Sequence, residues 1–101
     1  MTFDAEGFLV ELDRWTPAVA ETIAAREALS LTDTHWSLIE LARRYYDTYQ
    51  RSPNMRPLVK LAKTSLGEED GSSIGLMRLF TDQPAKQLAK LAGLPKPSRC
   101  L

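Results

Sequence analysis

The feature that most restricts the possible folds is a long helical repeat in the middle of the chain. Apolar residues recur every three or four positions over residues 33–50, and no glycine or proline interrupts them. The repeating residues are Leu38, Ala42, Tyr45 and Tyr49, with Trp36, Ile39 and Tyr46 alongside. Thr32 precedes the repeat and can cap the free amides of a first helical turn. The pattern predicts a helix over 33–50 that forms the spine of a helical core.

Proline and glycine divide most of the remaining chain into shorter helical segments. Pro17 follows Thr16 and Pro53 follows Ser52, and both pairs are typical of a helix start. Gly67 stands where the second of these segments should end. We therefore expect helices over 17–29, 53–66, 72–80 and 84–92, the third beginning at Ser72 or Ser73.

Two of these helices raise specific expectations. Pro57 lies inside the segment 53–66, where it lacks the amide that would bond to the Pro53 carbonyl, so we expect a kink or a helix that begins near Arg56. In the last helix the spacing predicts that Leu88, Leu91 and Ala92 face inward, while Lys86, Gln87 and Lys90 face outward.

The beginning of the chain is the only plausible β segment. Phe8, Val10 and Leu12 alternate with other residues, and Gly7 can form a turn before them, which predicts a small hairpin of 1–4 against 8–12. The chain of 101 residues is long enough for one small core. We therefore expect a single mainly α domain, a small orthogonal bundle of about five helices with a short N-terminal hairpin.

The end of the chain reads as an arm rather than as part of this bundle. Residues 94–101 have the sequence LPKPSRCL and contain the only cysteine, Cys100. Pro95 and Pro97 disfavour a helix and favour an extended course. At roughly 3.3 Å per residue, the sulfur could extend on the order of 20 Å beyond Gly93. Chain ends are usually mobile unless docked, so we expect a folded body, 1–93, and a mobile arm, 94–101.

Cys100 either has a chemical role or is a surface thiol without one. Lys96 and Arg99 flank it and favour the nucleophilic thiolate, although the terminal carboxylate of Leu101 opposes this slightly. Exposure invites oxidation, which argues against placement without purpose, yet a free cysteine is more often buried as a small hydrophobe. From these residues alone both interpretations stay open.

The charge distribution limits the possible partners. Lysine plus arginine and aspartate plus glutamate each number 13, so no net charge favours nucleic acid or a membrane surface. Residues 1–42 hold two basic and eight acidic side chains, whereas residues 43–101 hold eleven basic and five acidic ones. The positive half suits an acidic partner surface or a thiolate, but a solvated charged face would look the same.

No leader or membrane segment is recognisable. The start of the chain has no basic region followed by an apolar one, and no apolar run approaches the ~18 residues of a membrane span. We therefore expect a cytoplasmic protein, in which the thiol stays reduced.

Other chemistry finds little support in the sequence. One cysteine excludes an internal disulfide and a multi-cysteine metal site, and the common nucleotide-binding and zinc motifs are absent, so we expect no cofactor and no metal ligand. His35, the only histidine, stands beside Trp36 in the first turn of a predicted helix, where a structural role is more usual than a catalytic one. We interpret Trp15, Trp36 and the tyrosines as packing residues.

A helix-turn-helix that binds DNA is the alternative from another functional class. Arg43, Arg44, Arg51 and Arg56 surround one predicted corner between helices. A proline in the reading turn and a neutral domain argue against direct DNA binding, which would show a steep salt dependence.

Five blocks of sequence resemble the TusE/DsrC family of sulfur-relay proteins. They are D-A-E-G-F-L at 4–9, L-T-D-T-H-W at 31–36, S-P-N-M-R-P-L-V-K at 52–60, L-M-R-L-F at 76–80 and the whole stretch 84–101. They occur in family order and cover nearly the whole chain. The resemblance implies the same helical fold and a sulfurtransferase activity.

The resemblance also implies the site and its partners. Cys100 matches the penultimate cysteine of the family, so it would carry a persulfide and pass it to an acceptor thiol. In the TusE branch the donor is a TusBCD-like complex and the acceptor is an MnmA-like thiouridylase, which 2-thiolates the wobble uridine. The tRNA of the thiouridylase is a further candidate partner. No membrane partner is implied.

Two departures from the family pattern bear on this implication. DsrC-type members carry a second cysteine eleven positions before the penultimate one, and here that position is Ala89. One chain therefore cannot form a disulfide or bridge a sulfur between two of its cysteines, which favours the TusE-like role. A single-cysteine DsrC-like protein of sulfur oxidation or regulation stays open. The segment F-T-D-Q-P-A-K at 80–86 also lacks a proline and a glycine common in the family.

Overall fold

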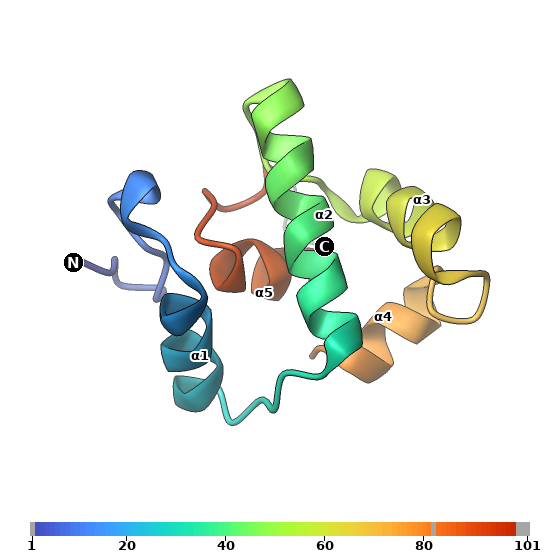
Figure 1. The fold of residues 1–101 in the computed structure, drawn as a ribbon, viewed down its shortest axis with the longest axis horizontal. Coiled ribbons are helices and arrows are strands. Elements are labelled where there is room, and N and C mark those ends of the chain that lie inside the picture. Colours follow the sequence, from blue (N-terminus) through green and yellow to red (C-terminus); the bar gives the residue numbers. More distant parts are fainter. Residues whose placement is uncertain (1, 82, 99–101) are drawn as a thin grey trace.

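The computed structural model describes residues 2–81 and 83–98, and five α-helices in these ranges form a small bundle (Figure 1). The helices are α1 Pro17–Arg26, α2 Asp33–Tyr49, α3 Met55–Leu66, α4 Ser73–Leu79 and α5 Pro84–Leu91, preceded by a short 3-10 helix, η1 Leu12–Arg14. They cross one another at steep angles in Figure 1 rather than running side by side. The predicted mainly helical fold is confirmed.

The short helix α5 lies at the centre of this bundle. It contacts each of the other four helices, and α1 and α2 pack on opposite sides of it in Figure 1. Its buried residues are Pro84, Ala85, Gln87, Leu88, Ala89 and Leu91. Because several of them are small, neighbouring helices can approach closely, and six of the eight residues of the helix are out of solvent.

The predicted inward face of α5 is correct, but the outward face is wrong at one position. Leu88, Leu91 and Ala92 are buried, as expected. Gln87 was predicted to face outward and is only 5% exposed. Its amide group donates to Glu27 Oε1 at 3.0 Å and accepts from the Thr81 amide at 2.9 Å. Since both ends of the amide find partners, its burial leaves no polar group unsatisfied.

The prediction for α2 holds at its start and differs by one residue at its end. Thr32 caps the helix: its Oγ1 accepts from the His35 amide at 3.4 Å, and His35 Nδ1 accepts from the Thr32 amide at 3.0 Å. The helix ends at Tyr49 because Gln50 adopts a left-handed backbone with φ 56°. Two mutual capping bonds thus fix the first turn.

Helix α1 is shorter than predicted, ending at Arg26 instead of near Leu29. Ala28 has φ 54°, a left-handed conformation that closes the helix. The Leu29 amide bonds to Ala24 O at 2.9 Å and the Ala28 amide to Ala25 O at 3.3 Å. These two bonds form a Schellman motif, which normally has glycine where Ala28 stands. No glycine stands at this end of the helix, so no residue pattern predicted it.

Helix α3 begins at Met55, which confirms a start near Arg56 and excludes one at Pro53. Pro57 then lies in the first turn, where backbone amides have no partner within the helix and a missing one costs little. Ser52, predicted as its cap, bonds through Oγ to Pro95 O instead. At the start of α4, Ser72 Oγ does accept from the Gly75 amide at 2.9 Å.

The predicted hairpin of 1–4 and 8–12 is not confirmed. Residues 2–12 form a turn with one antiparallel bridge, Phe3 to Leu9, and Leu12 belongs to η1. The Asp4 carboxylate accepts from the amides of Glu6 and Phe8, both at 2.9 Å. The Asp4 carboxylate thus closes the turn, and two backbone bonds cross it, from the Asp4 amide to Phe8 O and from the Val10 amide to Thr2 O, both at 2.8 Å. A first arm this short, with no third strand beside it, cannot hold a stable sheet.

None of the helices within 2–81 and 83–98 has both the length and the apolar character that crossing a bilayer requires.

Candidate functional site

The predicted thiol, Cys100, lies outside the described residues, as do Arg99 and Leu101. The site that can be described is therefore the segment that leads to it, residues 92–98, and the surface around that segment. Leu94 is 3% exposed and Pro97 is also buried. This part of the predicted arm lies against the body; that the arm as a whole is mobile stays a prediction.

The segment leaves α5 through a second Schellman motif. The Leu94 amide bonds to Ala89 O at 2.9 Å and the Gly93 amide to Lys90 O at 3.2 Å. Gly93 has φ 70°, and a Cβ atom on it would lie 2.3 Å from Trp15 Cδ1. Both the left-handed backbone and the touching indole require glycine here. This turn fixes the direction in which the chain leaves the helix.

Trp15 and Arg43 hold the carbonyl end of α5. Trp15 Nε1 donates to Leu91 O at 2.8 Å and Arg43 Nη1 donates to Ala92 O at 2.6 Å. The Arg43 guanidinium also lies 4.0 Å from the centre of the Trp15 ring, a cation–π contact. A cation at a helix C-terminus is favourable because the unpaired carbonyls there carry partial negative charge.

Burial lowers the pKa of Arg43 below its ordinary value, while the charge of Asp47 acts to raise it. The guanidinium stays charged at any physiological pH, so its hydrogen bond to Ala92 O does not depend on pH in that range. Trp15 was predicted only to pack and Arg43 only as part of a DNA-binding corner. The sequence alone missed that both hold the root of the arm, because the two are far apart in the chain.

Further along, polar side chains from two parts of the body, the N-terminal turn and the loop before α3, hold the segment. Ser52 Oγ donates to Pro95 O, and Asn54 Nδ2 donates to Ser98 Oγ at 3.0 Å. Lys96 Nζ lies 3.1 Å from Glu6 Oε1. The two prolines thus keep the segment extended while its polar groups bond sideways to the body.

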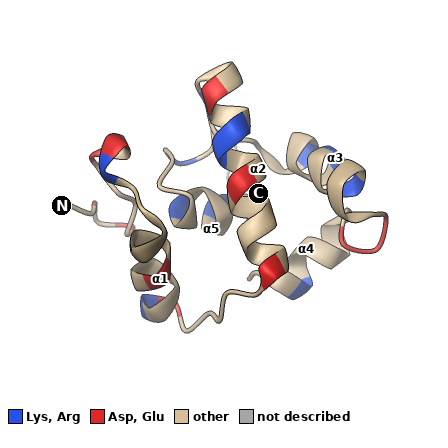
Figure 2. Cartoon of the chain, in the orientation of Figure 1, with Lys and Arg blue, Asp and Glu red and all other residues tan. Residues whose placement is uncertain are grey.

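Glu6 joins this segment to α5. Its Oε2 lies 2.8 Å from Lys86 Nζ, so one carboxylate pairs with Lys86 of α5 and Lys96 of the arm. Hydrogen bonds from Lys86 and then Lys96 hold the pKa of Glu6 below its usual value of 4.5. Lys90 pairs with Glu27 at 2.7 Å. Acidic residues of the N-terminal part therefore pair with the lysines of α5 and of the arm (Figure 2). The sequence could not predict these pairs, because their members are far apart in the chain.

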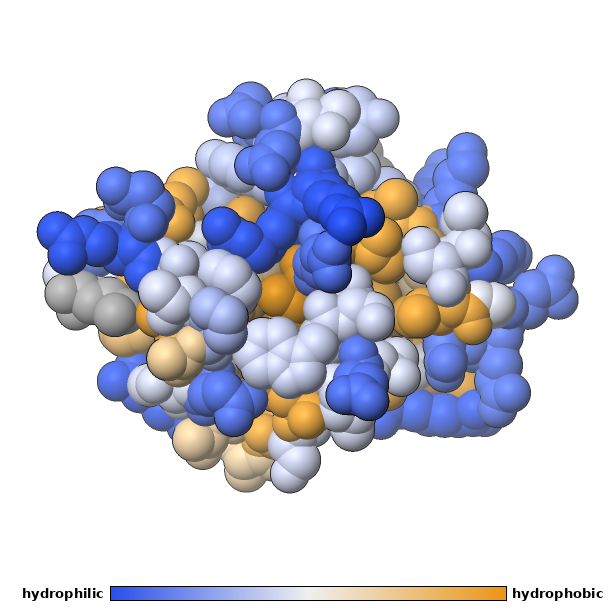
Figure 3. All heavy atoms as spheres, in the orientation of Figure 1, coloured by the Kyte–Doolittle hydropathy of each residue, from blue (hydrophilic) through white to orange (hydrophobic). Residues whose placement is uncertain are grey.

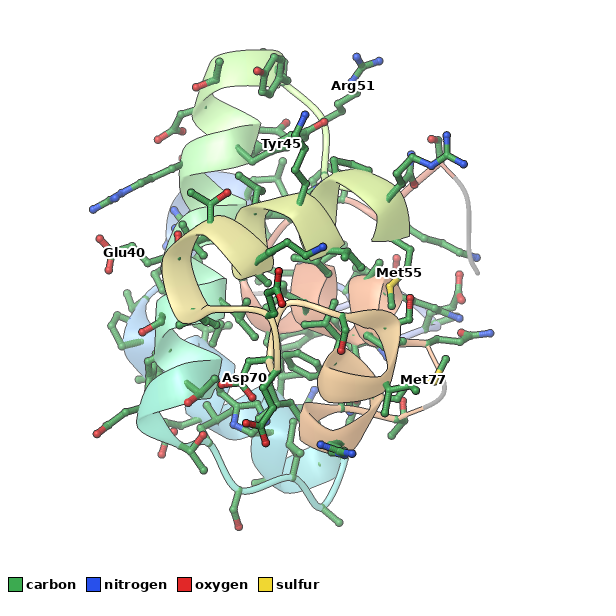
Figure 4. The ribbon with its side chains drawn as sticks, turned by 90° about the vertical axis from the view of Figure 1, so that its right-hand side faces the viewer. Glu40, Tyr45, Arg51, Met55, Asp70 and Met77 are labelled. Carbon is green, nitrogen blue, oxygen red and sulfur yellow. The ribbon has the colours of Figure 1, made fainter. Side chains whose placement is uncertain are left out.

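The four arginines of the predicted DNA-binding corner face two separate hollows. Arg43 and Arg44 line one of about 450 Å³ between α1 and α2, with Trp15, Trp36 and Ile39. In Figure 3, which views this side, apolar atoms show among strongly hydrophilic ones over α2. Arg51 and Arg56 line another of about 570 Å³, with Tyr45, Met55 and Ser98 (Figure 4). Arg43 is also engaged inside the protein, so the four do not form one nucleic-acid surface.

His35 has a structural role, as the sequence predicted. It is 4% exposed and lies at right angles to the Phe80 ring, 5.1 Å between ring centres. Its Nε2 faces Leu79 O and therefore donates to it, which leaves Nδ1 as the acceptor for Thr32. Nε2 thus joins α2 to α4, and Nδ1 helps to cap the first turn of α2 itself. In the part of the chain that the structure describes, no three histidine, aspartate or glutamate side chains group to hold a metal.

Comparison with known proteins identifies close relatives over the full length. The family described as DsrC like protein matches residues 1–101. "Sulfurtransferase TusE" of Sodalis glossinidius is 48% identical over 98 residues, covering 97% of this chain and 91% of that protein. The TusE homologue of Haemophilus influenzae is 45% identical, covering 97% of this chain and 90% of that protein.

Solved structures of DsrC have the same fold. DsrC of Allochromatium vinosum matches with a TM-score of 0.88 at 44% identity, covering 98% of this chain and 88% of that one. Oxidised DsrC of Archaeoglobus fulgidus, the gamma-subunit of its dissimilatory sulfite reductase, also matches with a TM-score of 0.88, at 34% identity, covering 100% and 92%.

Proposed function

This chain belongs to the DsrC-like family, and from that premise we propose that it is a sulfurtransferase of the TusE kind that carries sulfur on Cys100. The observation that carries the proposal is its 48% identity over 97% of its length to a protein named for that activity. The family match covers residues 1–101 and therefore includes the C-terminal stretch that holds the only cysteine of this chain. A carrier of this type works in a sulfur relay for thiolation of tRNA.

The chemistry needs only one thiol. The Cys100 thiolate attacks the outer sulfur of a donor persulfide, an S–S bond to Cys100 forms, and the donor S–S bond breaks. The donor leaves as a thiolate, and the proton of the transferred SH stays with it or exchanges with solvent. An acceptor thiolate then attacks the outer sulfur on Cys100 in the same way. Each step conserves electrons, so neither an oxidant nor a cofactor takes part.

Ala89 supports the one-thiol mechanism over a two-cysteine one. Position 89 is buried on α5, 1% exposed, and carries a methyl group. The described segment 92–98 supports delivery, because it is extended and bonded to the body along one side. Lys96 and Arg99, the cations that flank Cys100 in sequence, favour the thiolate.

The proposal includes specific partners and a compartment. The donor is a TusBCD-like complex, and the acceptor is an MnmA-like thiouridylase that modifies the wobble uridine of tRNA. The protein works in the cytoplasm, where reducing conditions keep a lone thiol available. These partners and this compartment are inferred from the similarity to TusE proteins.

Mass spectrometry of the loaded protein tests the thiol chemistry. After incubation with a persulfide donor, we expect a mass gain of about 32 Da, one sulfur, on the peptide that contains Cys100. The gain should disappear with dithiothreitol and be absent in Cys100→Ser. If the wild-type protein gains no sulfur from any persulfide donor, the proposal is wrong.

Thiolation of tRNA in cells tests the pathway. Replacing the gene by its Cys100→Ser form should abolish the 2-thio group of the wobble uridine. Unchanged thiolation together with sulfur loading of Cys100 would instead favour the second candidate, a single-cysteine carrier of sulfur oxidation. That candidate is supported by the 44% identity to Allochromatium DsrC.

A further inference from the structure

The side of the molecule formed by α3 and α4 exposes apolar residues that the bundle does not use (Figure 4). Ile74 and Met77 of α4 are 66% and 49% exposed. They stand three residues apart and so share one helix face. Met55 and Val59 of α3 are partly buried and line, with Ser73 of α4, a hollow of about 350 Å³. We call Met55, Val59, Ile74 and Met77 the α3–α4 apolar face.

Cations border this face on the α3 side. Residues 48–66 contain Arg51, Arg56, Lys60 and Lys63 and no acidic residue. Among the described residues, the ion pairs between α5 or the arm and the N-terminal part engage Lys86, Lys90 and Lys96, and none of them engages these four. The lysines of α5 are therefore paired, whereas Arg51, Arg56 and Lys60 lie away from the acidic loop 68–70, which follows the C-terminal end of α3 (Figure 2).

The α3 part of the apolar face is continuous with the basic hollow. Met55 and Arg56 line both the 350 Å³ hollow and the 570 Å³ hollow that contains Arg51. Ser98 lines the second hollow as well. From Ser98 to Cys100 the chain can advance at most about 7 Å, since each residue spans roughly 3.5 Å. A molecule bound on this surface therefore lies within short reach of the thiol.

We propose that the α3–α4 apolar face, with Arg51 and Arg56, docks an acidic amphipathic segment of the protein that exchanges sulfur with Cys100. The proposal rests on the sulfur-carrier function and names the surface that function uses. Apolar side chains of the partner would cover Met77 and Ile74, and its carboxylates would pair with the arginines. Methionine suits such a face because its flexible thioether adapts to different partners.

The chemistry of the surface favours a protein over RNA. Recognition of single-stranded RNA relies on bases stacked on aromatic side chains. Within the described residues, the two hollows include one aromatic side chain, that of Tyr45. Exposed aliphatic and thioether groups are instead typical of protein interfaces, where methionine and arginine are enriched.

Two variants and two matched controls test the proposal. Met77→Asp places a charge on the apolar face, and Val10→Asp does the same at a residue 56% exposed elsewhere. Arg56→Glu reverses a charge on the surface, and Arg14→Glu reverses one in η1. All four positions are exposed or carry no helix-packing role, and circular dichroism should show the wild-type helix content in each.

Each variant is assayed in two reactions. The first is loading of Cys100 by inorganic polysulfide, followed by mass spectrometry. The second is sulfur exchange with the purified TusBCD-like and MnmA-like proteins of the same organism. We expect polysulfide loading to be unchanged throughout, and Met77→Asp and Arg56→Glu to slow exchange with at least one protein about tenfold or more. Added salt should slow the wild type more than Arg56→Glu.

The outcomes distinguish a failure of the docking surface from a failure of the sulfur-carrier function. If Cys100 takes up no sulfur even from polysulfide, the sulfur-carrier function is wrong and the docking surface falls with it. If loading is normal and both face variants exchange sulfur with both proteins as the controls do, the docking surface alone is wrong. Unchanged protein exchange with a loss of tRNA affinity would likewise overturn it in favour of an RNA contact.

Discussion

At the scale of single residues, the two Schellman motifs show how much depends on one backbone angle. Ala28 closes α1 with φ 54° and Gly93 closes α5 with φ 70°. A left-handed backbone costs a residue with a side chain roughly 1–2 kcal/mol, and glycine almost nothing. The protein tolerates that cost at Ala28, which is exposed. A side chain is not tolerated at position 93, because Trp15 occupies the space that its Cβ atom would need.

Exchanging the residue types at these two positions should have opposite effects. Gly93→Ala should lower the free energy of unfolding by about 2–4 kcal/mol, through left-handed strain and displacement of Trp15. Ala28→Gly should raise it by about 0.5–1 kcal/mol, since relief of strain exceeds the added flexibility of the unfolded chain. Urea unfolding followed by circular dichroism measures both. Equal effects at the two sites would contradict this explanation.

At the scale of elements, the described part of the arm is joined to the rest of the protein by side chains rather than by secondary structure. Glu6, Ser52 and Asn54 reach it from the N-terminal turn and from the loop before α3. Trp15 and Arg43 hold its root from η1's end and from α2. The contacts from Glu6 and Asn54 are exposed and therefore individually weak, whereas Ser52 is buried and Leu94 belongs to the core. Release of the arm without unfolding of the bundle is therefore easiest at the outer end of the described segment.

The Glu6 link should respond to acid. Because Lys86 and Lys96 lower the folded-state pKa of Glu6 below 4.5, the link is fully formed above that pH and is lost as the pH falls through the lowered value. The amide signals of Lys96 and Ser98 in ¹⁵N NMR spectra should shift with a midpoint below 4.5. In Glu6→Gln that titration should be absent. A midpoint at or above 4.5 would show that the lysines do not contact Glu6 in solution.

At the scale of the whole molecule, a short helix late in the chain organises the core. Helix α5 packs against all four other helices. Helix α2 is longer, but it packs closely against only two, α3 and α5. The core is therefore complete only with α5 in place. The arm follows immediately after α5, so the element that completes the core also positions the segment that leads to Cys100.

A core substitution in α5 should therefore be far more damaging than one on the docking surface. Leu91 is fully buried, and Leu91→Ala should lower the free energy of unfolding by about 2–5 kcal/mol through the cavity it leaves. Ile74→Ala, at a residue 66% exposed, should change it by less than about 0.5 kcal/mol. Denaturant midpoints of the two variants give the comparison. A small loss for Leu91→Ala would mean that α5 is not the centre of the core.

Local signals in the chain were enough to predict most helices and the family. Thr32 before a helical repeat, proline at the start of α1 and α5, and glycine after α3 and α5 act within a few residues, so their effect can be inferred without the fold. The same holds for Cys100, whose position next to the chain end and between cations is a property of the sequence. The hairpin prediction was not confirmed, because two short strands need a third strand beside them to be stable. Local sequence does not show whether a third strand is present.

By itself, the sequence determined the helices, the single thiol and the family, since each rests on residues close together in the chain. Only the tertiary structure decided that Gln87 is buried, that Trp15 and Arg43 hold the root of the arm, and that lysines of α5 pair with Glu6 and Glu27. The tertiary structure also places the basic residues of α3 next to the α3–α4 apolar face. These outcomes depend on which distant side chains meet across α5, and the helical period specifies a face of each helix but not its neighbour.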